Sequence, residues 1–258
     1  MKIKKLSKNI STESSKLIEN IINQLEPEDP TLLTYHNNYV KTSKFRISQD
    51  LDIVKRNFTK DHHILEVGSI PLLFTVALSK TGYMVTGCDI SPERYSSTIK
   101  NMNLQIIKCD IEKNKLPSNN SSYDAVIFNE IFEHLRINLI FTLSELFRVL
   151  KPGGKLILST PNLRSLKGIY NFLFKGISYS RAGDIFTEYE KLERLGHMGH
   201  VREYTSTEVI NLLKKIGFEI SEINYRGNYN HLLARLFLKL FKSLSPFITF
   251  IFTKPNSI

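Results

Sequence analysis

Short apolar runs alternate with helical stretches from His62 onward, and this alternation constrains the fold more than any other feature. The runs contain few polar positions, as expected of strands that are buried on both faces of a sheet and covered by helices. Strands joined through such helices run parallel. The sequence therefore predicts an α/β fold with a doubly wound sheet. The predicted strands are 64–67, 83–88, 104–108, 125–129, 155–160, 218–225 and 247–253, and the helices among them are 71–81, 92–101, 139–150, 206–216 and 231–244.

Residues 1–58 precede this alternation, and we interpret them as an N-terminal helical cap or substrate lid. Apolar residues at helical spacing predict an amphipathic helix over 11–25. The segment 26–48 is turn-rich and aromatic, and it leads into a predicted helix over 49–58. Residues 59–258 are expected to form the main domain. Within it, 163–204 is predicted to be an acceptor lid, because Lys167 to Gly196 is longer than most loops.

The composition restricts the cellular setting. The 35 basic residues outnumber the 25 acidic ones and give a formal charge of +10, which favours anionic partners. The two cysteines, Cys88 and Cys109, have no metal or disulfide spacing, as is typical of a reducing compartment. The chain shows no signal peptide and no apolar run of membrane-spanning length. We therefore expect a cytoplasmic protein.

Three consecutive predicted strands end in residues that can hold a nucleoside. Gly68 ends the first strand and lets the backbone pass close to a ligand, while the next helix offers amide donors. Asp89 ends the second, where a carboxylate can accept hydrogen bonds from both ribose hydroxyls. Asp110 ends the third, where its carboxylate or the Ile111 amide can meet an adenine edge. Ligands of open α/β sheets bind at such strand ends, so the sequence predicts one nucleoside site.

These endings belong to a longer series of motifs that resembles the class I S-adenosylmethionine-dependent methyltransferases. In chain order the series is 66–68, Asp89, Asp110, 123–129 and 148–158, extended by 199–205 and 213–218. Its most specific piece is the Lys-Pro-Gly-Gly turn at 151–154, before the fifth strand. The resemblance implies a Rossmann-like, seven-stranded sheet, mostly parallel with an antiparallel last strand, and a methyltransferase activity.

The resemblance also implies S-adenosylmethionine as the cofactor. It places Glu66 and Gly68 near the amino acid part, Asp89 at the ribose, Asp110 and Ile111 at the adenine, and Asn129 near the methionine moiety; Ser69 and Ile90 complete the predicted cofactor-binding set. The first loop departs from the family pattern, because Gly68 is its only glycine and Ile70 and Pro71 follow. Ile70 is expected to crowd the cofactor and lower its affinity.

The run after the fourth predicted strand offers a candidate reaction centre. If it opens a helix, Glu130, Glu133 and His134 fall on one side. The pattern is similar to one that holds a divalent metal in ubiquinone-pathway O-methyltransferases and in enzymes that methylate the 2′-hydroxyl at small-RNA 3′ ends. A cation beside a hydroxyl lowers its pKa, so we predict a Mg²⁺ or Zn²⁺ site with these ligands, which His197 or His200 could complete. Without a metal, His134 acts as a general base or orients the acceptor, and Glu133 assists it.

Two further regions concern partners. His197, His200 and Arg202 gather before the penultimate helix and are predicted, with Tyr35, to bind the acceptor. The C-terminal helix sets Arg235, Lys239 and Lys242 beside an apolar face, a pattern compatible with a peripheral membrane contact and equally with a helix packed on the sheet edge.

Taken together, these patterns favour O-methylation of a small-molecule, sugar or lipid-linked acceptor. One alternative is an RNA ribose 2′-O-methyltransferase, which the charge and the Glu-Glu-His pattern would suit. No basic run interleaved with aromatic residues supports nucleic-acid binding. The other alternative is a catalytically silent binding module, for which the glycine-poor first loop is the argument. The sequence does not indicate an oligomeric state.

Overall fold

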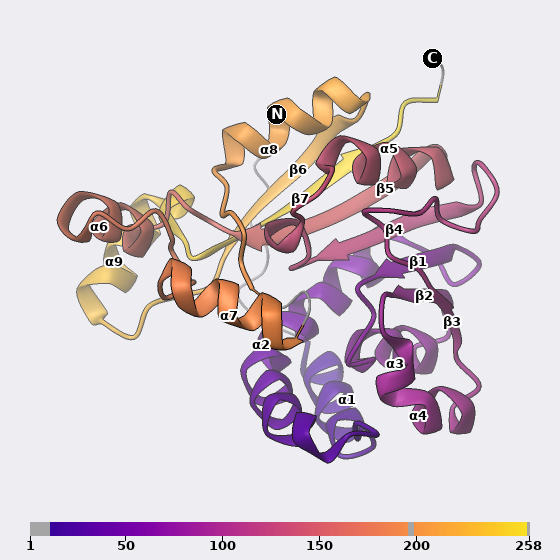
Figure 1. Cartoon of the computed structure of the whole chain (residues 1–258). Coiled ribbons are helices and arrows are strands. Elements are labelled where there is room, and N and C mark those ends of the chain that lie inside the picture. Colours follow the sequence, from indigo (N-terminus) through magenta and orange to yellow (C-terminus); the bar gives the residue numbers. More distant parts are fainter. Residues whose placement is uncertain (1–10, 196–198, 257–258) are drawn as a thin grey trace. The chain divides into compact units, whose positions relative to one another are not determined.

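The computed structural model describes residues 11–195 and 199–256, and these divide into two compact units within 11–127 and 128–256. The described residues contain a seven-stranded sheet with strand order β3-β2-β1-β4-β5-β7-β6 (Figure 1). This order, with helices between the strands, confirms the predicted Rossmann-like, doubly wound α/β fold.

The unit within 11–127 contains parallel strands and the first helices. Its elements are α1 (Thr12–Ile22), η1 (Pro30–Leu32), α2 (Leu33–Asn57), β1 (His63–Val67), α3 (Leu73–Lys80), β2 (Met84–Asp89), η2 (Pro92–Tyr95), α4 (Ser96–Asn101), β3 (Gln105–Lys108) and most of β4 (Tyr123–Asn129). β1 pairs in parallel with β2 and β4, and β2 pairs in parallel with β3. Ile64 and Leu65 are fully buried, so β1 has the apolar run that a strand covered on both faces requires.

The helical content before β1 is greater than the sequence predicted. The expectation of a turn-rich segment over 26–48 was wrong, because α2 already begins at Leu33. Val40, Ile47, Leu51 and Val54 are buried at helical spacing, and this packing overrides the polar and aromatic residues that suggested turns. α1 and α3 both pack on α2 in the same unit as β1. The proposed domain boundary at residue 58 stays a prediction.

The unit within 128–256 contains the rest of the sheet. Its elements are η3 (Phe132–His134), α5 (Leu139–Val149), β5 (Leu150–Pro161), α6 (Leu166–Lys175), α7 (Ile185–Leu195), α8 (Ser206–Ile216), β6 (Glu219–Arg226), α9 (Leu232–Leu240), η4 (Lys242–Leu244) and β7 (Phe247–Thr253). β7 runs antiparallel to both β5 and β6, which confirms the antiparallel last strand. α8 begins with a capping box between Thr205 and Glu208.

Two local expectations in this unit need correction. The Lys-Pro-Gly-Gly piece is part of β5 rather than a turn before it, because Gly153 N donates to Lys254 O at 2.9 Å and Lys254 N donates to Gly154 O at 2.9 Å. The predicted lid holds two helices, α6 and α7, that the sequence analysis did not assign. Among the described helices, none is both long and apolar enough to span a bilayer.

Candidate functional site

The ends of β1, β2 and β3 bring the three predicted nucleoside residues to neighbouring positions. Gly68 N donates to Cys88 O at 2.8 Å, and Cys109 N donates to Asp89 O at 2.9 Å, so each strand end is hydrogen-bonded to the next. Gly68 has a φ of +75°, a conformation that favours glycine and turns the chain at this point. Gly68, Asp89 and Asp110 therefore follow one another along the edge of this part of the sheet.

The carboxylate of Asp89 organises two loops. Its Oδ2 accepts a hydrogen bond from Ile70 N at 3.0 Å, and its Oδ1 accepts one from Ser91 N at 2.9 Å. The half-buried Ile90 lies within the second of these loops. Asp89 therefore fixes the loop that departs from the family pattern, and the Ile70 amide serves this internal contact.

Asp110 has a more open setting. Its Oδ1 accepts a hydrogen bond from Glu112 N at 3.1 Å, and its Oδ2 pairs with the exposed Lys113 ammonium at 3.0 Å. The neighbouring Ile111 is half-buried. The contact with Lys113 is weak in solvent, so the Asp110 carboxylate can exchange it for a ligand.

Glu66 is a buried acid in this unit. Burial raises the pKa of its carboxyl to about 8, although a hydrogen bond from Thr75 Oγ1 opposes that shift. Asp89 and Asp50 raise the same pKa further, while Arg46 lowers it. Glu66 is therefore mostly protonated at neutral pH unless a cation binds beside it.

Two predicted cofactor residues carry buried polar atoms that lack a partner. Among the described residues, the side-chain amide nitrogen and oxygen of Asn129 and the hydroxyl of Ser69 are buried and have no hydrogen-bond partner. Ser69 Oγ lies 2.9 Å from the point where a Cβ on Gly87 would stand, so the glycine leaves room for it. An unpaired buried amide is costly, and Asn129 ends β4 where the resemblance expects the methionine moiety. This residue fits a role in binding the cofactor.

Tyr35 lies in α2, in the unit of the nucleoside residues, with 39% of its surface exposed. Its ring centroid is 6.2 Å from that of Tyr39. The next residue, His36, is buried and its Nδ1 lies 2.7 Å from the hydroxyl of Tyr95. An acceptor-binding role for Tyr35 stays a prediction.

In the second unit, Glu133, His134 and His200 form a cluster. One ligand atom from each lies within 4.8 Å of the others, and Glu133 is buried. The predicted helix is only the short 3-10 turn η3, so its side chains do not form a helical stripe. Glu130, the third predicted ligand, has a φ of +56° and accepts a hydrogen bond from Ser159 Oγ at 2.7 Å. The group that converges contains His200 in place of Glu130.

The hydrogen bonds of the two histidines show which ring nitrogen of each faces an acceptor. His134 Nδ1 is 2.9 Å from Gly199 O, and a carbonyl only accepts, so Nδ1 carries the proton and Nε2 keeps a lone pair. His200 Nδ1 is 3.2 Å from the Glu203 carboxylate. A histidine that donates its outer N–H to a carbonyl or carboxylate is the arrangement found in metal ligands. Two imidazoles and one carboxylate fit Zn²⁺ better than Mg²⁺.

Burial and charge set the protonation of this cluster. Burial raises the pKa of Glu133 to about 8, and the charge of Glu130 raises it as well, while His200 opposes the shift. Burial lowers the pKa of His200, but its hydrogen bond to Glu203 and the charge of Glu133 raise it above the ordinary value. The shared charges therefore hold a proton within the cluster at neutral pH.

Glu203 is a site residue that the sequence analysis missed. Its carboxylate accepts hydrogen bonds from Ser180 N at 2.6 Å, Arg181 N at 2.9 Å and Ala182 N at 3.0 Å, and also from the Ser180 hydroxyl. Burial opposes ionisation, yet the hydrogen bonds from His200 and Ser180 lower its pKa to about 2. Glu203 thus fastens the chain between α6 and α7 to the segment that carries His200.

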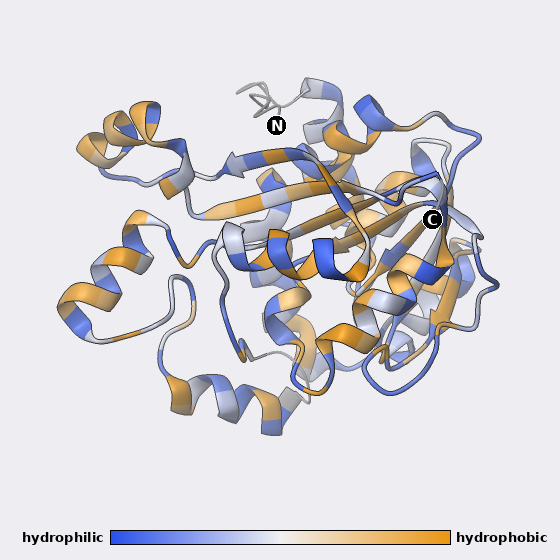
Figure 2. Ribbon diagram, turned by 90° about the horizontal axis from the view of Figure 1, so that it is seen from above, coloured by the Kyte–Doolittle hydropathy of each residue, from blue (hydrophilic) through white to orange (hydrophobic). Residues whose placement is uncertain are grey.

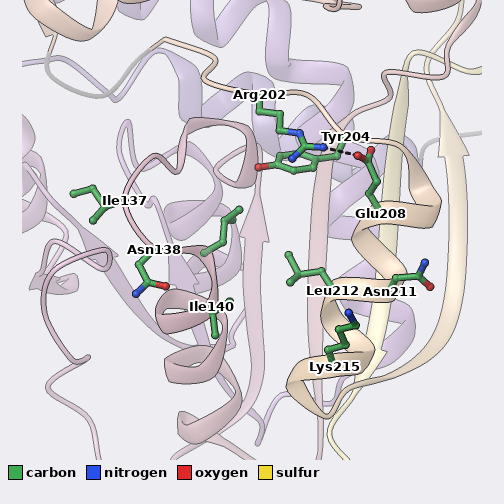
Figure 3. A pocket seen from close by; sticks show the side chains of 10 residues that line it. Ile137, Asn138, Ile140, Arg202, Tyr204, Glu208, Asn211, Leu212 and Lys215 are labelled. Atoms are coloured by element: carbon green, nitrogen blue, oxygen red, sulfur yellow. Dashed lines mark hydrogen bonds and ion pairs between the residues drawn. The ribbon is translucent and has the colours of Figure 1, made fainter.

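Arg202 lies at a separate pocket of about 590 Å³ (Figure 3). The guanidinium stands 4.8 Å from the centroid of the Tyr204 ring and donates to Glu208 Oε1 at 2.5 Å. The pocket is lined by Ile137, Asn138, Leu139, Ile140, Arg202, Tyr204, Glu208, Asn211, Leu212 and Lys215. The structure thus places Arg202 in an open, partly apolar pocket, and His197 lies outside the described residues.

Comparisons with known proteins agree with this fold. Residues 65–158 match a family model described as a methyltransferase domain. A mitochondrial ubiquinone biosynthesis O-methyltransferase from Rattus norvegicus is 30% identical over 119 residues, which cover 43% of this chain and 34% of that relative. The chain thus matches about a third of the length of this relative.

Solved structures resemble the chain over most of its length at low identity. A SAM-dependent methyltransferase from Archaeoglobus fulgidus has a TM-score of 0.58 and 16% identity, covering 84% of this chain and 99% of its own. A Burkholderia thailandensis 1,6-didemethyltoxoflavin-N1-methyltransferase, solved with S-adenosylhomocysteine, has a TM-score of 0.56 and 12% identity, covering 97% of this chain and 93% of its own. These likenesses concern the fold, and they agree with the resemblance drawn from the motifs.

Proposed function

We propose, on the premise that residues 65–158 form a methyltransferase domain, that this chain is an S-adenosylmethionine-dependent methyltransferase acting on oxygen. The acceptor is a hydroxyl of a small molecule, a sugar or a lipid-linked compound. The observation that carries the choice of oxygen is the place of His134, whose Nδ1 donates to Gly199 O, in one cluster with Glu133 and His200, which suits a general base.

The cofactor half of the proposal rests on the residues that the motifs assign. Asp89 and Asp110 are assigned to the nucleoside, with Ile90 and Ile111 beside them. Glu66, Gly68, Ser69 and Asn129 are assigned to the methionine part. When bound, the cofactor supplies a methyl group on a positively charged sulfur, which is already activated for transfer. The ammonium of its methionine part is a cation that would draw the Glu66 carboxyl into its ionised form.

The acceptor half rests on the cluster of Glu133, His134 and His200. This cluster suits two mechanisms. In the first, His134 removes the hydroxyl proton and Glu133 helps to hold it. In the second version the three side chains hold a divalent cation, for which their donor set favours Zn²⁺. A bound cation would lower the pKa of an acceptor hydroxyl. In both versions positioning supplies much of the rate, since the sulfonium needs no covalent help from the protein.

Calorimetric titration tests the cofactor half without any acceptor. We expect S-adenosylmethionine to bind the full chain, and Asp89→Ala to weaken binding by about tenfold or more, because hydrogen bonds to a carboxylate are worth about 1.5–3 kcal/mol. Asp61→Ala, at an exposed acid of the same unit, is the matched control and should bind normally. A folded wild-type chain that takes up no cofactor would instead be the silent module.

Transfer from methyl-labelled cofactor to a panel of catechols, phenols, sugars and RNA tests the acceptor half. We expect label in O-methyl products of the small acceptors. Label in RNA alone would replace the proposal by ribose methylation. Titration of the chelator-treated chain with Zn²⁺ decides between the two versions, since His200→Ala should abolish uptake only if the cluster holds a metal.

A further inference from the structure

The second unit exposes two helices whose apolar side chains face solvent. In α6, Phe172 and Leu173 are each 66% exposed and Phe174 is 74% exposed. In α9, Leu233 is 68% exposed and Leu240 is 80% exposed, and further exposed residues are Leu232, Leu236 and Phe237, with Phe241 directly after the helix. Figure 2 shows both helices at one end of the unit, with hydrophobic residues along them. Exposed apolar side chains in such number indicate a contact with another phase or partner.

The polarity of α6 is inverted relative to an ordinary surface helix. Its buried face consists of Gly168 and Asn171, while its aromatic face is open. A Cβ on Gly168 would lie 1.9 Å from Leu163 O, so the small residue allows this close approach. Asn171 Nδ2 donates to Tyr179 O at 2.8 Å. The fold therefore satisfies the polar face internally and leaves the large apolar side chains of α6 mostly exposed.

The two helices rise from one hydrogen-bonded base. Lys167 N, at the start of α6, donates to the hydroxyl of Tyr229, which precedes α9, at 3.2 Å. Asn162 Nδ2, just before α6, donates to Ser243 O at 2.9 Å and to Ser245 O at 2.8 Å, both after α9. The residues before and after α9 are thus tied to the base of α6, and the exposed apolar residues of the two helices are together called the α6–α9 surface.

The charge of this surface selects the partner. The segment 163–183 holds Arg164, Lys167, Lys175 and Arg181, and 227–245 holds Arg235, Lys239 and Lys242, with no Asp or Glu in either. A second copy of the chain would place this cationic surface against itself, which like charges oppose. An anionic lipid surface offers both apolar depth and negative charge.

We infer that the α6–α9 surface docks the protein on the face of an anionic lipid bilayer. The helices lie in the interfacial plane, with Phe172, Phe174 and Leu240 entering the boundary of the acyl chains. Lys175, Arg235 and Lys239 contact the lipid headgroups. α7 is outside this surface, because its charges are of both signs: the exposed Asp184, Glu190 and Glu193 accompany Lys191 and Arg194, although Phe186 is 79% exposed.

Vesicle flotation of the full chain tests this inference. We expect binding to phosphatidylcholine vesicles that contain phosphatidylglycerol, and little binding to phosphatidylcholine alone. Phe172→Ser with Phe174→Ser should lower the partition coefficient by about tenfold or more, given the apolar area withdrawn. Arg235→Gln with Lys239→Gln should lower it by about fivefold for each cation, with a weaker dependence on salt. Phe186→Ser on α7 is the matched control and should bind like the wild type.

Equal binding to neutral and anionic vesicles, or unchanged binding of both double variants, would overturn the inference. So would a loss with Phe186→Ser as large as that of the α6 variant. A wild-type dimer in sedimentation velocity that the α6 variant dissociates, without vesicle binding, would assign the surface to a second copy. Circular dichroism checks that the variants fold, and the substituted side chains are exposed. The assay needs no cofactor, so its failure leaves the proposed methyl transfer untouched.

Discussion

The two units hold their polar groups by different means. In the first, Gly68, Asp89 and Asp110 lie at or just after the ends of consecutive strands, and backbone hydrogen bonds between those strand ends place them. In the second, His134 and His200 come from segments far apart in the chain, and they are held by Gly199 O and by the side chain of Glu203. The sheet itself dictates the first arrangement, whereas the second depends on a few individual acceptors. The first should tolerate substitutions around it, and the second should not.

The largest expected effect is on kcat, and it should separate catalysis in the second unit from cofactor binding in the first. His134→Ala should lower kcat by about 10²–10⁴, the usual contribution of a positioned general base, on whichever panel acceptor is turned over fastest. The dissociation constant for S-adenosylmethionine should remain within about twofold of the wild-type value, because the change leaves Asp89 and Asp110 in place. Initial rates at saturating labelled cofactor and calorimetry measure the two quantities.

His62→Ala is the control for removing an imidazole, since His62 lies before β1 and accepts a hydrogen bond only from Thr59 N among the contacts described. It should leave both quantities unchanged. If His134→Ala instead weakened cofactor binding and spared kcat, the division of tasks between the units would be wrong.

The second prediction concerns the buried acid of the first unit. Because burial raises the pKa of Glu66 from 4.5 to about 8, the folded chain keeps its proton where the unfolded chain has lost it. The stability that this group contributes is complete below pH 4.5 and is lost as the pH rises toward 8. Glu66→Gln should therefore be more stable than the wild type at pH 8, by about 2–4 kcal/mol, since one pKa unit corresponds to about 1.4 kcal/mol. Near pH 4 the two proteins should unfold alike.

Urea unfolding at several pH values measures this difference, with the exposed Glu26→Gln as the control that should show none.

The Glu66→Gln variant also tests the assignment of Glu66 to the cofactor site. Wild-type binding of S-adenosylmethionine should strengthen between pH 6 and pH 8, because a bound ammonium requires Glu66 to ionise. Binding by Glu66→Gln should be weaker and independent of pH. If cofactor binding by Glu66→Gln still depended on pH, Glu66 would not belong to the cofactor site.

The sequence predicted the first arrangement well for a physical reason. A strand buried on both faces is a continuous apolar run, and the polar residue that ends it is visible without knowledge of the fold, as at Asp89 and Asp110. All seven strands lie close to their predicted ranges, including the antiparallel β7. The α2 helix was missed over 33–48 because its buried contacts, such as that of His36 with Tyr95, come from tertiary packing.

The second arrangement was predicted only in part. Glu133 and His134 were visible as neighbours and His200 was named with His197 as a completing ligand, but the predicted helix was wrong, since a single 3-10 turn replaces it. The convergence of His200 depends on contacts across more than sixty residues, such as that of His134 with Gly199 at a separation of 65. No local period encodes such a contact. Glu203 was missed because an acid that accepts backbone amides looks, in sequence, like any surface acid.

The smallest expected effect tests whether the second arrangement depends on that acid. Glu203→Gln keeps one oxygen that can accept from Arg181 and Ala182, but it turns an amide toward the Ser180 donors. Two unpaired buried donors should cost about 1–2 kcal/mol of local stability. Amide exchange at 180–182 should therefore accelerate about tenfold, while amides of β1 and β2 stay protected. Glu222→Gln, another buried acid of this unit, is the matched control and should leave 180–182 unchanged. If exchange accelerated equally in both units, the acid would support the whole fold, and the contrast between a site made by strand ends and one made by single side chains would fail.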